Sequence, residues 1–254
     1  MIEDIGNLLQ HWPYNAKDSI RKIISPDGAE KIQVRVDQGP FQGILQMELD
    51  GRPDGQKPHD SVFVLDHFQE KLDHHIEENG ASEGFSLKKS QCRELFDESR
   101  LLYERYIFLL QLQDYDRVIR DTEQNMDLCR FVNRYATTDK DRLNLEKWWP
   151  YILRIHAIAR VMIATQDEDF ESGIRIIKDV LDQIENLEKV DAEEFVVEKR
   201  RSTKALNELC EELEQKRPLT EPERLKKELL EAIDNEEFER AAQLRDRIKN
   251  TDKI

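Results

Sequence analysis

Turn-forming residues are unevenly distributed along the 254-residue chain. Six of the nine glycines and five of the eight prolines lie within the first sixty residues. Because glycine and proline form turns and interrupt helices, this segment predicts short strands, whereas the rest of the chain predicts long helices. Residues 30–37 and 43–50 alternate apolar and polar side chains, and residues 19–25 favour a strand. We expect a three-stranded antiparallel meander covered by the first long helix, residues 60–79.

A tripeptide recurs three times within the helical part of the chain. An aromatic residue between two acidic residues occupies positions 114–116, 169–171 and 237–239. Each tripeptide lies between two apolar helical patterns, and a small or aliphatic pair follows it, so each predicts a turn between two closely packed helices. The spacing between the tripeptides is not constant, which excludes a regular solenoid. The first two units resemble degenerate tetratricopeptide-type hairpins.

These patterns predict an α+β protein that is mostly α. Residues 1–85 are expected to form a small α+β domain that contains the meander, and residues 86–217 an all-helical region. Residues 218–254 are expected to form a separate helical hairpin. Within the helical region, Thr138 predicts a helix N-cap, and Pro150 either kinks one helix or begins another.

The charge balance and the cysteines restrict the possible partners and compartment. With 54 acidic against 39 basic residues the formal net charge is −15, which opposes direct contact with nucleic acid. No stretch approaches about 18 apolar residues, and no apolar signal core follows the N-terminus. Cys92, Cys129 and Cys210 lie far apart within helical patterns, as reduced and buried thiols do. We therefore expect a cytoplasmic protein that binds no membrane, metal or cofactor.

The last thirty residues carry the most specific pattern in the chain. An aromatic residue, an Ala-Ala pair and an Arg-Asp pair follow one another in order within residues 238–246. With the flanking apolar positions, these residues resemble the UVR motif, the short helical hairpin shared by the excision-repair proteins UvrB and UvrC. The residues that carry the resemblance are Leu225, Leu229, Ala232, Glu236, Phe238, Glu239, Ala241, Ala242, Leu244, Arg245, Asp246 and Ile248.

The resemblance implies an interaction module. In the family this hairpin pairs with another hairpin, and it also occurs in activators of protein-arginine kinases and in some Clp-type chaperones. The nucleotide-binding strings of UvrB, the nuclease domains of UvrC and the paired C-x-x-C segments of the kinase activators are missing from this sequence. Residues 33–55 are also similar to the N-terminal part of uncharacterised bacterial proteins that carry the motif.

Residue patterning independently predicts a hairpin in this segment. Thr220 and Glu223 can form a capping box ahead of an apolar stripe at Leu225, Leu229 and Ala232. Two helices of about fourteen residues cannot enclose a dry core by themselves, so another surface must complete it. The second helix is expected to bury Phe238, Ala241, Ala242, Leu244 and Ile248.

Other polar clusters in the sequence have simpler explanations than catalysis or metal binding. His67, Glu70 and His74 share one helix face, but no partner Glu-x-x-His motif is evident, so a solvated face explains them better. Asp50 and Asp54 lie in a glycine-rich loop, and the preference of Asp and Gly for turns explains them better than a catalytic role does.

Trp148 and Trp149 belong to the densest aromatic cluster of the chain. Tryptophan is frequent at binding hot spots, so partner contact is an alternative to core packing there. His156, a few residues further on, is interpreted as an ordinary helix residue.

These observations predict a non-enzymatic adaptor with a helical body and a docking hairpin. The hairpin is expected to dock on a second UVR hairpin or on its own copy as a homodimer, with Arg245 and Asp246 adding ion pairs at the rim. The alternative is an accessory factor in nucleotide-excision DNA repair that acts through UvrB-like or UvrC-like partners. The expected partner-binding residues are Leu225, Leu229, Phe238, Ala241, Ala242, Leu244, Arg245, Asp246, Trp148 and Trp149.

Overall fold

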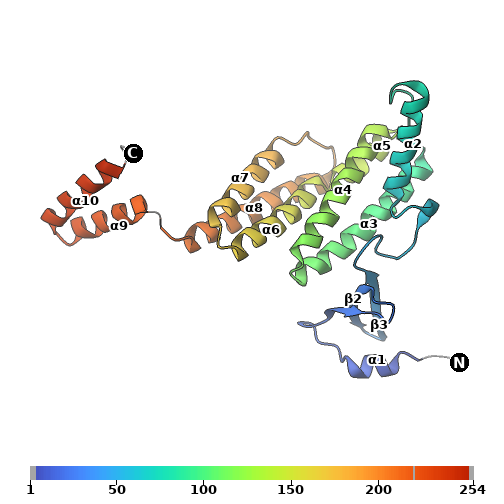
Figure 1. The fold of residues 1–254 in the computed structure, drawn as a ribbon, viewed down its shortest axis with the longest axis horizontal. Coiled ribbons are helices and arrows are strands. Elements are labelled where there is room, and N and C mark those ends of the chain that lie inside the picture. The colour runs from blue at the N-terminus through green and yellow to red at the C-terminus, as the bar shows by residue number, and fades with distance from the viewer. Residues whose placement is uncertain (1–3, 220, 252–254) are drawn as a thin grey trace. The chain divides into compact units, whose positions relative to one another are not determined.

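The computed structural model describes residues 4–219 and 221–251 (Figure 1). The chain forms two compact units, Met1–Cys210 and Glu211–Ile254. The architecture is mostly helical, with a small antiparallel sheet near the N-terminus, as predicted. The finer division at residues 85 and 217 stays a prediction. Thr220, the expected capping residue, lies outside the described residues.

Three short strands form the sheet. They are β1 (Ile20–Ile24), β2 (Glu30–Gln38) and β3 (Phe41–Glu48), paired antiparallel in the order β1-β2-β3. Val34 lies opposite both Ile20 and Leu45, so apolar side chains of all three strands share one face. Gly39 adopts a φ of 59° in the turn between β2 and β3, a backbone conformation that favours glycine. The predicted meander is therefore confirmed. A short helix, α1 (Gly6–His11), precedes it.

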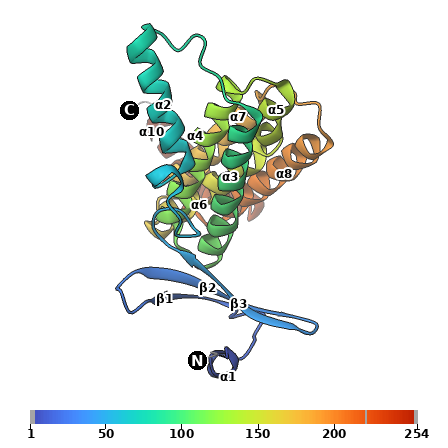
Figure 2. The same cartoon turned by 90° about the vertical axis from the view of Figure 1, so that its right-hand side faces the viewer.

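The apolar face of the sheet shares one buried cluster with three helices: the C-terminal part of α3 (Lys89–Gln111), the first turn of α4 (Tyr115–Tyr135) and the middle of α6 (Trp149–Gln166). Ile32, Val34 and Leu49 are buried in one cluster with these helices. The first long helix, α2 (Val64–Asn79), instead packs against α3, and Figure 2 shows it away from the strands. The expected cover is thus corrected: α3, α4 and α6 cover the sheet. The helical side of the cluster consists of Tyr106, Leu109, Tyr115, Val118, Ile155 and Ala159.

A buried carboxylate of α3 holds the N-terminus of α2. The side chain of Glu98 accepts hydrogen bonds from the backbone N–H groups of Val64 at 2.7 Å and Leu65 at 3.0 Å. The first N–H groups of a helix lack partners within it, and a negative charge there also complements the helix dipole. Burial raises the pKa of Glu98, and the two N–H groups together with Arg52 offset part of that rise.

Arg105 joins the sheet to the helical body. Its side chain is completely buried, and it donates to both carboxylate oxygens of Asp121 at 2.6 and 2.8 Å. The remaining Nη1 atom donates to the backbone carbonyls of Glu48 at 3.0 Å and Gly51 at 2.7 Å. One guanidinium therefore connects α3, α4 and the end of β3. Because a buried charge is costly without partners, this network fixes the position of the sheet on the helices.

The remaining helices complete the body and the C-terminal unit. Thr138 caps its helix as predicted, because its Oγ1 accepts a hydrogen bond from the N–H of Asp141 at 3.2 Å. Pro150 lies in the first turn of α6, so it begins a helix rather than kinking one. None of the described helices is long and apolar enough to cross a membrane. The bounds are α5 (Asp139–Glu146), α7 (Phe170–Glu185), α8 (Glu193–Lys216), α9 (Glu221–Asp234) and α10 (Phe238–Thr251), with a 3-10 turn at Pro58–Asp60.

The same turn joins the helices of three hairpins, α3–α4, α6–α7 and α9–α10. Gln113, Glu168 and Glu236 each adopt a left-handed conformation, with φ of 57°, 58° and 58°. In each turn the next residue donates its N–H to a carbonyl five residues earlier, at 3.0, 2.8 and 2.8 Å, as in the Schellman motif. The donor is in each case the first acidic residue of the tripeptide, and the aromatic residue after it begins the second helix. The recurring tripeptide therefore marks a recurring turn, as the sequence predicts.

Candidate functional site

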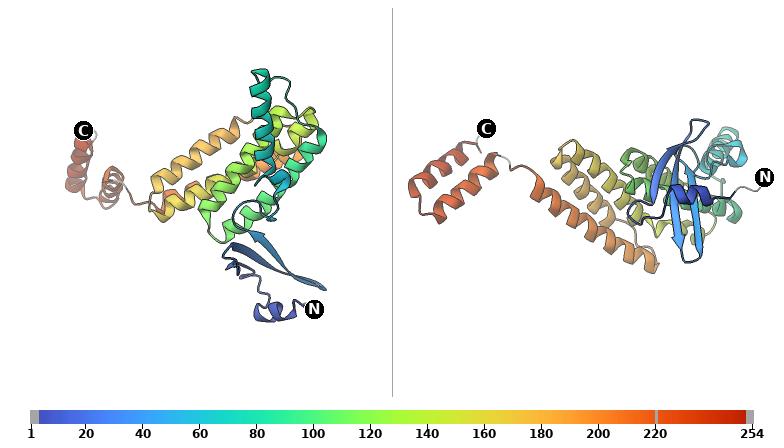
Figure 3. Two further views of the ribbon diagram at one scale, coloured as in Figure 1. Left: turned by 45° about the vertical axis from the view of Figure 1, so that its right-hand side comes forward. Right: turned by 90° about the horizontal axis from the view of Figure 1, so that it is seen from below.

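The C-terminal hairpin has a small core of its own. Leu225 and Ala232 of α9 are buried against Ala241 and Leu244 of α10. Leu229 and Ile248 are partly buried beside them. Figure 3 shows the two helices antiparallel and side by side. The predicted apolar stripe of α9 is thus confirmed, and it packs on the second helix of the same hairpin.

Large apolar side chains remain on the outside of this hairpin. Phe238, Leu230 and Ile233 have exposed fractions of 69%, 63% and 48%. Ala242 is also exposed. The expectation that α10 buries Phe238 and Ala242 is therefore wrong. Phe238 begins the helix, and both residues lie on the flank of α10 rather than on the side that meets α9.

Helical geometry places these four residues on one face of the hairpin. Leu230 and Ile233 each follow a core position by one residue, so they lie about 100° around α9 from its contact with α10. Phe238 and Ala242, one turn apart, are displaced in the same rotational sense on α10. Two antiparallel helices in contact are related by an approximate twofold axis perpendicular to their plane, which keeps both displaced stripes on the same side. We name Leu230, Ile233, Phe238 and Ala242 the apolar face of the hairpin.

The matching positions of the other two hairpins show what normally happens to such an aromatic. Tyr115, which begins α4, is only 6% exposed and belongs to the cluster beneath the sheet. Phe170, which begins α7, is half-buried. Phe238 begins α10 after the same turn and is 69% exposed. The body covers the aromatic of the first hairpin, whereas the third hairpin leaves its aromatic uncovered.

Two charged residues predicted for the rim lie on the surface of α10. Arg245 donates from Nε and Nη2 to the Asp246 carboxylate at 3.3 and 3.2 Å. Both side chains are more than half exposed. They pair with each other in this structure, so a partner would gain an ion pair only by displacing that contact.

Comparison with known families gives a match for this hairpin. Residues 223–254 match the family model of the UvrB/uvrC motif. The match covers almost all of α9 and the whole of α10 and includes the apolar face, so the resemblance read from the sequence is confirmed. No curated protein and no solved structure is significantly similar to the chain. The UVR motif is thus the part of the chain for which a relationship is shown.

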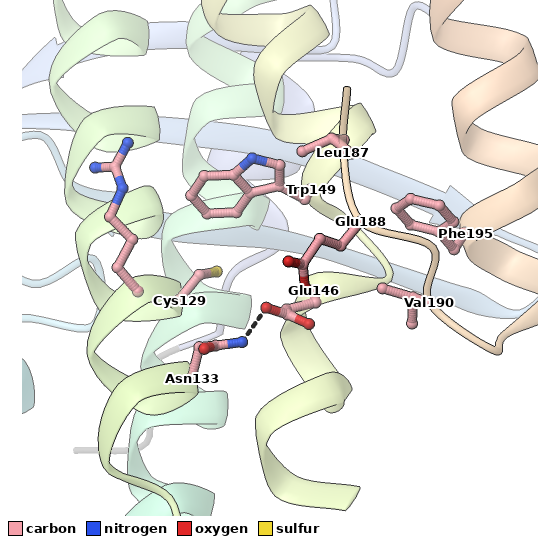
Figure 4. Close-up of a pocket in the computed structure, with 9 residues that line it drawn as sticks. Cys129, Asn133, Glu146, Trp149, Leu187, Glu188, Val190 and Phe195 are labelled. Atoms are coloured by element: carbon pink, nitrogen blue, oxygen red, sulfur yellow. Dashed lines mark hydrogen bonds between the residues drawn. The ribbon is translucent and has the colours of Figure 1, made fainter. Parts of the chain in front are cut away.

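The two adjacent tryptophans lie in different pockets of the body. Trp149 lines a pocket of about 300 Å³ together with Cys129, Glu146 and Glu188 (Figure 4). Trp148, which is 40% exposed, lines a larger pocket that shares Cys129 with the first. Their separation follows from helical geometry, because consecutive helix residues point about 100° apart.

The pocket at Trp149 contains no activated nucleophile among its described lining residues. Burial raises the pKa of the Cys129 thiol to about 12, so it stays protonated. Burial also raises the pKa of Glu146, the nearby charge of Glu188 raises it further, and a hydrogen bond from Asn133 opposes the rise. Figure 4 shows the two carboxylates side by side, with the Asn133 amide on Glu146. Cys92, Cys129 and Cys210 are all buried, as predicted.

The other polar clusters hold structural contacts. The ring of His67 stacks on that of His59 with centroids 4.1 Å apart, and His74 pairs with Glu78 at 3.3 Å. Within the described residues no group of three or more His, Cys, Asp or Glu side chains could hold a metal ion.

The acidic residues of the N-terminal loop are paired with arginines. Asp54 accepts from Arg52 at 2.9 Å, and Asp50 accepts from Arg120 at 2.7 Å. Burial opposes ionisation of Asp50, but the bond from Arg120 and the charge of Arg117 hold its pKa below the usual range.

Proposed function

We propose that this protein is a non-enzymatic adaptor whose UVR hairpin docks on a second protein through its apolar face. The observation that carries the proposal is the exposure of Phe238 at 69% within the matched segment, after a turn whose counterpart in the body covers its aromatic. Fully burying a side chain such as Phe or Leu contributes about 1.5–3 kcal/mol. The apolar face therefore offers a favourable contact that the hairpin cannot make alone.

The most direct partner is another UVR hairpin, either on a second copy of this chain or on a different protein. A twofold pairing would place the same apolar face on both sides of the interface, as symmetric dimers do. The short helices and small internal core also favour a partner that adds buried surface. Association costs roughly 4–15 kcal/mol of lost freedom, so we expect a complex that depends on protein concentration.

Light scattering coupled to size exclusion tests this proposal over a concentration series. The samples are the full chain, a chain ending at Arg217, and the double variant Leu230→Ser with Phe238→Ser. Ile24→Ser is the matched control, because Ile24 is 74% exposed and lies far from the hairpin in sequence. We expect a concentration-dependent dimer that both hairpin changes abolish and the control preserves.

Where the full chain stays monomeric, the same samples are titrated with isolated UVR hairpins of UvrB-type and UvrC-type proteins. Binding that the double variant loses supports docking on a different protein. The proposal is refuted if the full chain neither self-associates nor binds a hairpin, or if the double variant behaves like the control.

A repair-accessory role is the second candidate, and the UvrB/uvrC motif match favours it. The net charge of −15 opposes direct phosphate contact, so this role would run through protein partners. A filter-binding titration over salt distinguishes direct from indirect action, because phosphate contacts give a steep logarithmic salt dependence. We expect no salt-dependent DNA binding by the chain alone.

A further inference from the structure

The larger pocket of the helical body has the features of a binding site. Its volume is about 630 Å³, within the usual range for ligand pockets, and residues of α3, α4, α5, α6 and α8 line it. Ser99 and Asn125 lie among its most buried residues, and Ser99 Oγ donates to Asn125 Oδ1 at 2.6 Å. Tyr106, only 1% exposed, lies beside them. We name it the aromatic pocket.

Aromatic side chains dominate the apolar part of this pocket. Tyr103 and Tyr151 pack with their ring centroids 5.7 Å apart. Tyr103 and Trp148 are each 40% exposed, although both are large aromatic residues on a well-packed body. Phe96 completes the set. Rings arranged in this way favour another aromatic ring in an offset or edge-on contact.

Positive charge surrounds the aromatic rings. Four cationic side chains line the pocket but only one carboxylate, that of Glu198. Arg154 and Arg201 both pair with Glu198, at 3.6 and 3.0 Å. The other two cations are Lys147, paired with Glu194 at 2.9 Å, and Arg100, paired with Glu104 at 2.8 Å. Because two arginines share one carboxylate, the four cations meet three carboxylates, which leaves one net positive charge at the pocket in a strongly acidic chain.

Glu198 is enclosed in the wall of the pocket. Its side chain is 9% exposed, and its buried Oε2 atom lies 3.6 Å from Nη2 of Arg154 without a hydrogen bond. Buried acceptors are normally satisfied, and leaving one unpaired is costly. The guanidinium of Arg154 is the donor at hand for this atom, so Glu198 holds Arg154 and Arg201 at the pocket.

We propose that the aromatic pocket binds an acidic segment of a partner protein that carries an aromatic side chain. The ring packs on the exposed sides of Tyr103 and Trp148, and the flanking carboxylates meet the arginines and Lys147. A peptide offers both groups on one short segment. This inference rests on the proposed adaptor function, since it gives the helical body a partner chemistry of its own.

Tryptophan indole signals in a proton–nitrogen correlation NMR spectrum of the full chain provide the test. The chain has three tryptophans, Trp12, Trp148 and Trp149, and each is assigned by its Trp→Phe variant. The probes are three acetylated and amidated pentapeptides, Glu-Glu-Phe-Glu-Glu, Glu-Glu-Ala-Glu-Glu and Lys-Lys-Phe-Lys-Lys. We expect only the first peptide to move the Trp148 signal saturably, while the Trp12 signal stays in place.

Charge variants test the rim of the pocket. Arg201→Gln and Lys147→Gln are each expected to weaken binding of the first peptide about two- to fivefold, as exposed ion pairs do. Arg130→Gln is the matched control for Arg201→Gln, because the two side chains are 61% and 66% exposed and Arg130 lines the pocket at Trp149 instead. Equal binding of all three peptides, or equal weakening by the control, would overturn the inference.

The two proposals fail separately. If the first peptide leaves Trp148 unmoved while the double hairpin variant still loses association, the aromatic pocket is not a peptide site and the adaptor proposal stands. If the peptide binds as expected but the hairpin variants associate normally, the adaptor proposal fails and the peptide site stands.

Discussion

Asp121→Asn removes the charge from an ion pair that no solvent reaches. The side chains of Arg105 and Asp121 are 0% and 1% exposed, and two hydrogen bonds of 2.6 and 2.8 Å join them. Breaking a buried pair by changing one partner costs about 3–5 kcal/mol, because the other charge stays buried without compensation. Asparagine keeps one acceptor for the guanidinium, so we expect a loss near the lower end, about 3 kcal/mol. Typical domains have only about 5–15 kcal/mol of stability.

Urea unfolding followed by far-ultraviolet circular dichroism measures this loss. In a Trp148→Phe, Trp149→Phe background, fluorescence also reports on the sheet, because the remaining Trp12 is 8% exposed and the guanidinium of Arg21 lies 4.0 Å from its ring. Arg105 also donates to the carbonyls that end β3, so we expect the sheet to loosen together with the helices.

Two further variants decide whether the buried charge is the cause. Asp127→Asn is the matched control, since Asp127 lies on the same helix and pairs with Arg130 but is 57% exposed. We expect it to cost less than about 1 kcal/mol. The double variant Arg105→Met with Asp121→Leu removes both charges and is expected to recover part of the stability, since the carbonyls of Glu48 and Gly51 lose a donor and Arg120 loses Asp121. The reasoning is refuted if Asp121→Asn costs no more than the control, or if the double variant is as unstable as the single one.

Three other predictions follow from burial. Burial lowers the pKa of His156 to about 4, so between pH 4 and about pH 6.5 the unfolded chain binds more protons than the folded chain. The free energy of unfolding should therefore rise by up to about 3 kcal/mol as the pH increases across that window. Urea titrations at several pH values should show this slope, and His156→Gln should flatten it. Because burial raises the pKa of Cys129 to about 12, iodoacetamide should label it only after unfolding, and fast labelling of the native chain, read by mass spectrometry, would contradict this. Leu244→Ala should cost about 2–4 kcal/mol and speed hydrogen exchange in residues 221–251 but not in the body, whereas equal acceleration in both would argue against an independent hairpin.

Local sequence patterns predicted the strands and turns because interactions between residues close in the sequence determine them. Alternation gave β2 and β3, and the acidic-aromatic-acidic tripeptide located three turns that share one geometry. Helix capping by Thr138 is likewise a short-range event and was predicted correctly. The brief helix α1 escaped prediction, since its six residues are too few for a period to show.

Long-range packing could not be predicted in the same way. The Glu98 carboxylate meets the N–H of Val64 across 34 positions, and no periodicity encodes that pairing. The same holds for the helices that cover the sheet. The position of Phe238 after its turn matches that of Tyr115, which the body covers, so spacing alone could not predict that Phe238 is 69% exposed. For Trp148 and Trp149, sequence suggested one cluster, and the fold assigned them to two pockets.

Replacing the three left-handed turn residues by glycine would raise the stability of the fold. Gln113, Glu168 and Glu236 hold a conformation that costs a residue with a Cβ atom about 1 kcal/mol and that glycine adopts freely. In a unit the size of Met1–Cys210, which holds Gln113 and Glu168, 1 kcal/mol corresponds to roughly 2–4 °C in melting temperature. A lineage moving to a warmer habitat could therefore gain heat tolerance by single substitutions at these turns, with the aromatic pocket and the apolar face left untouched.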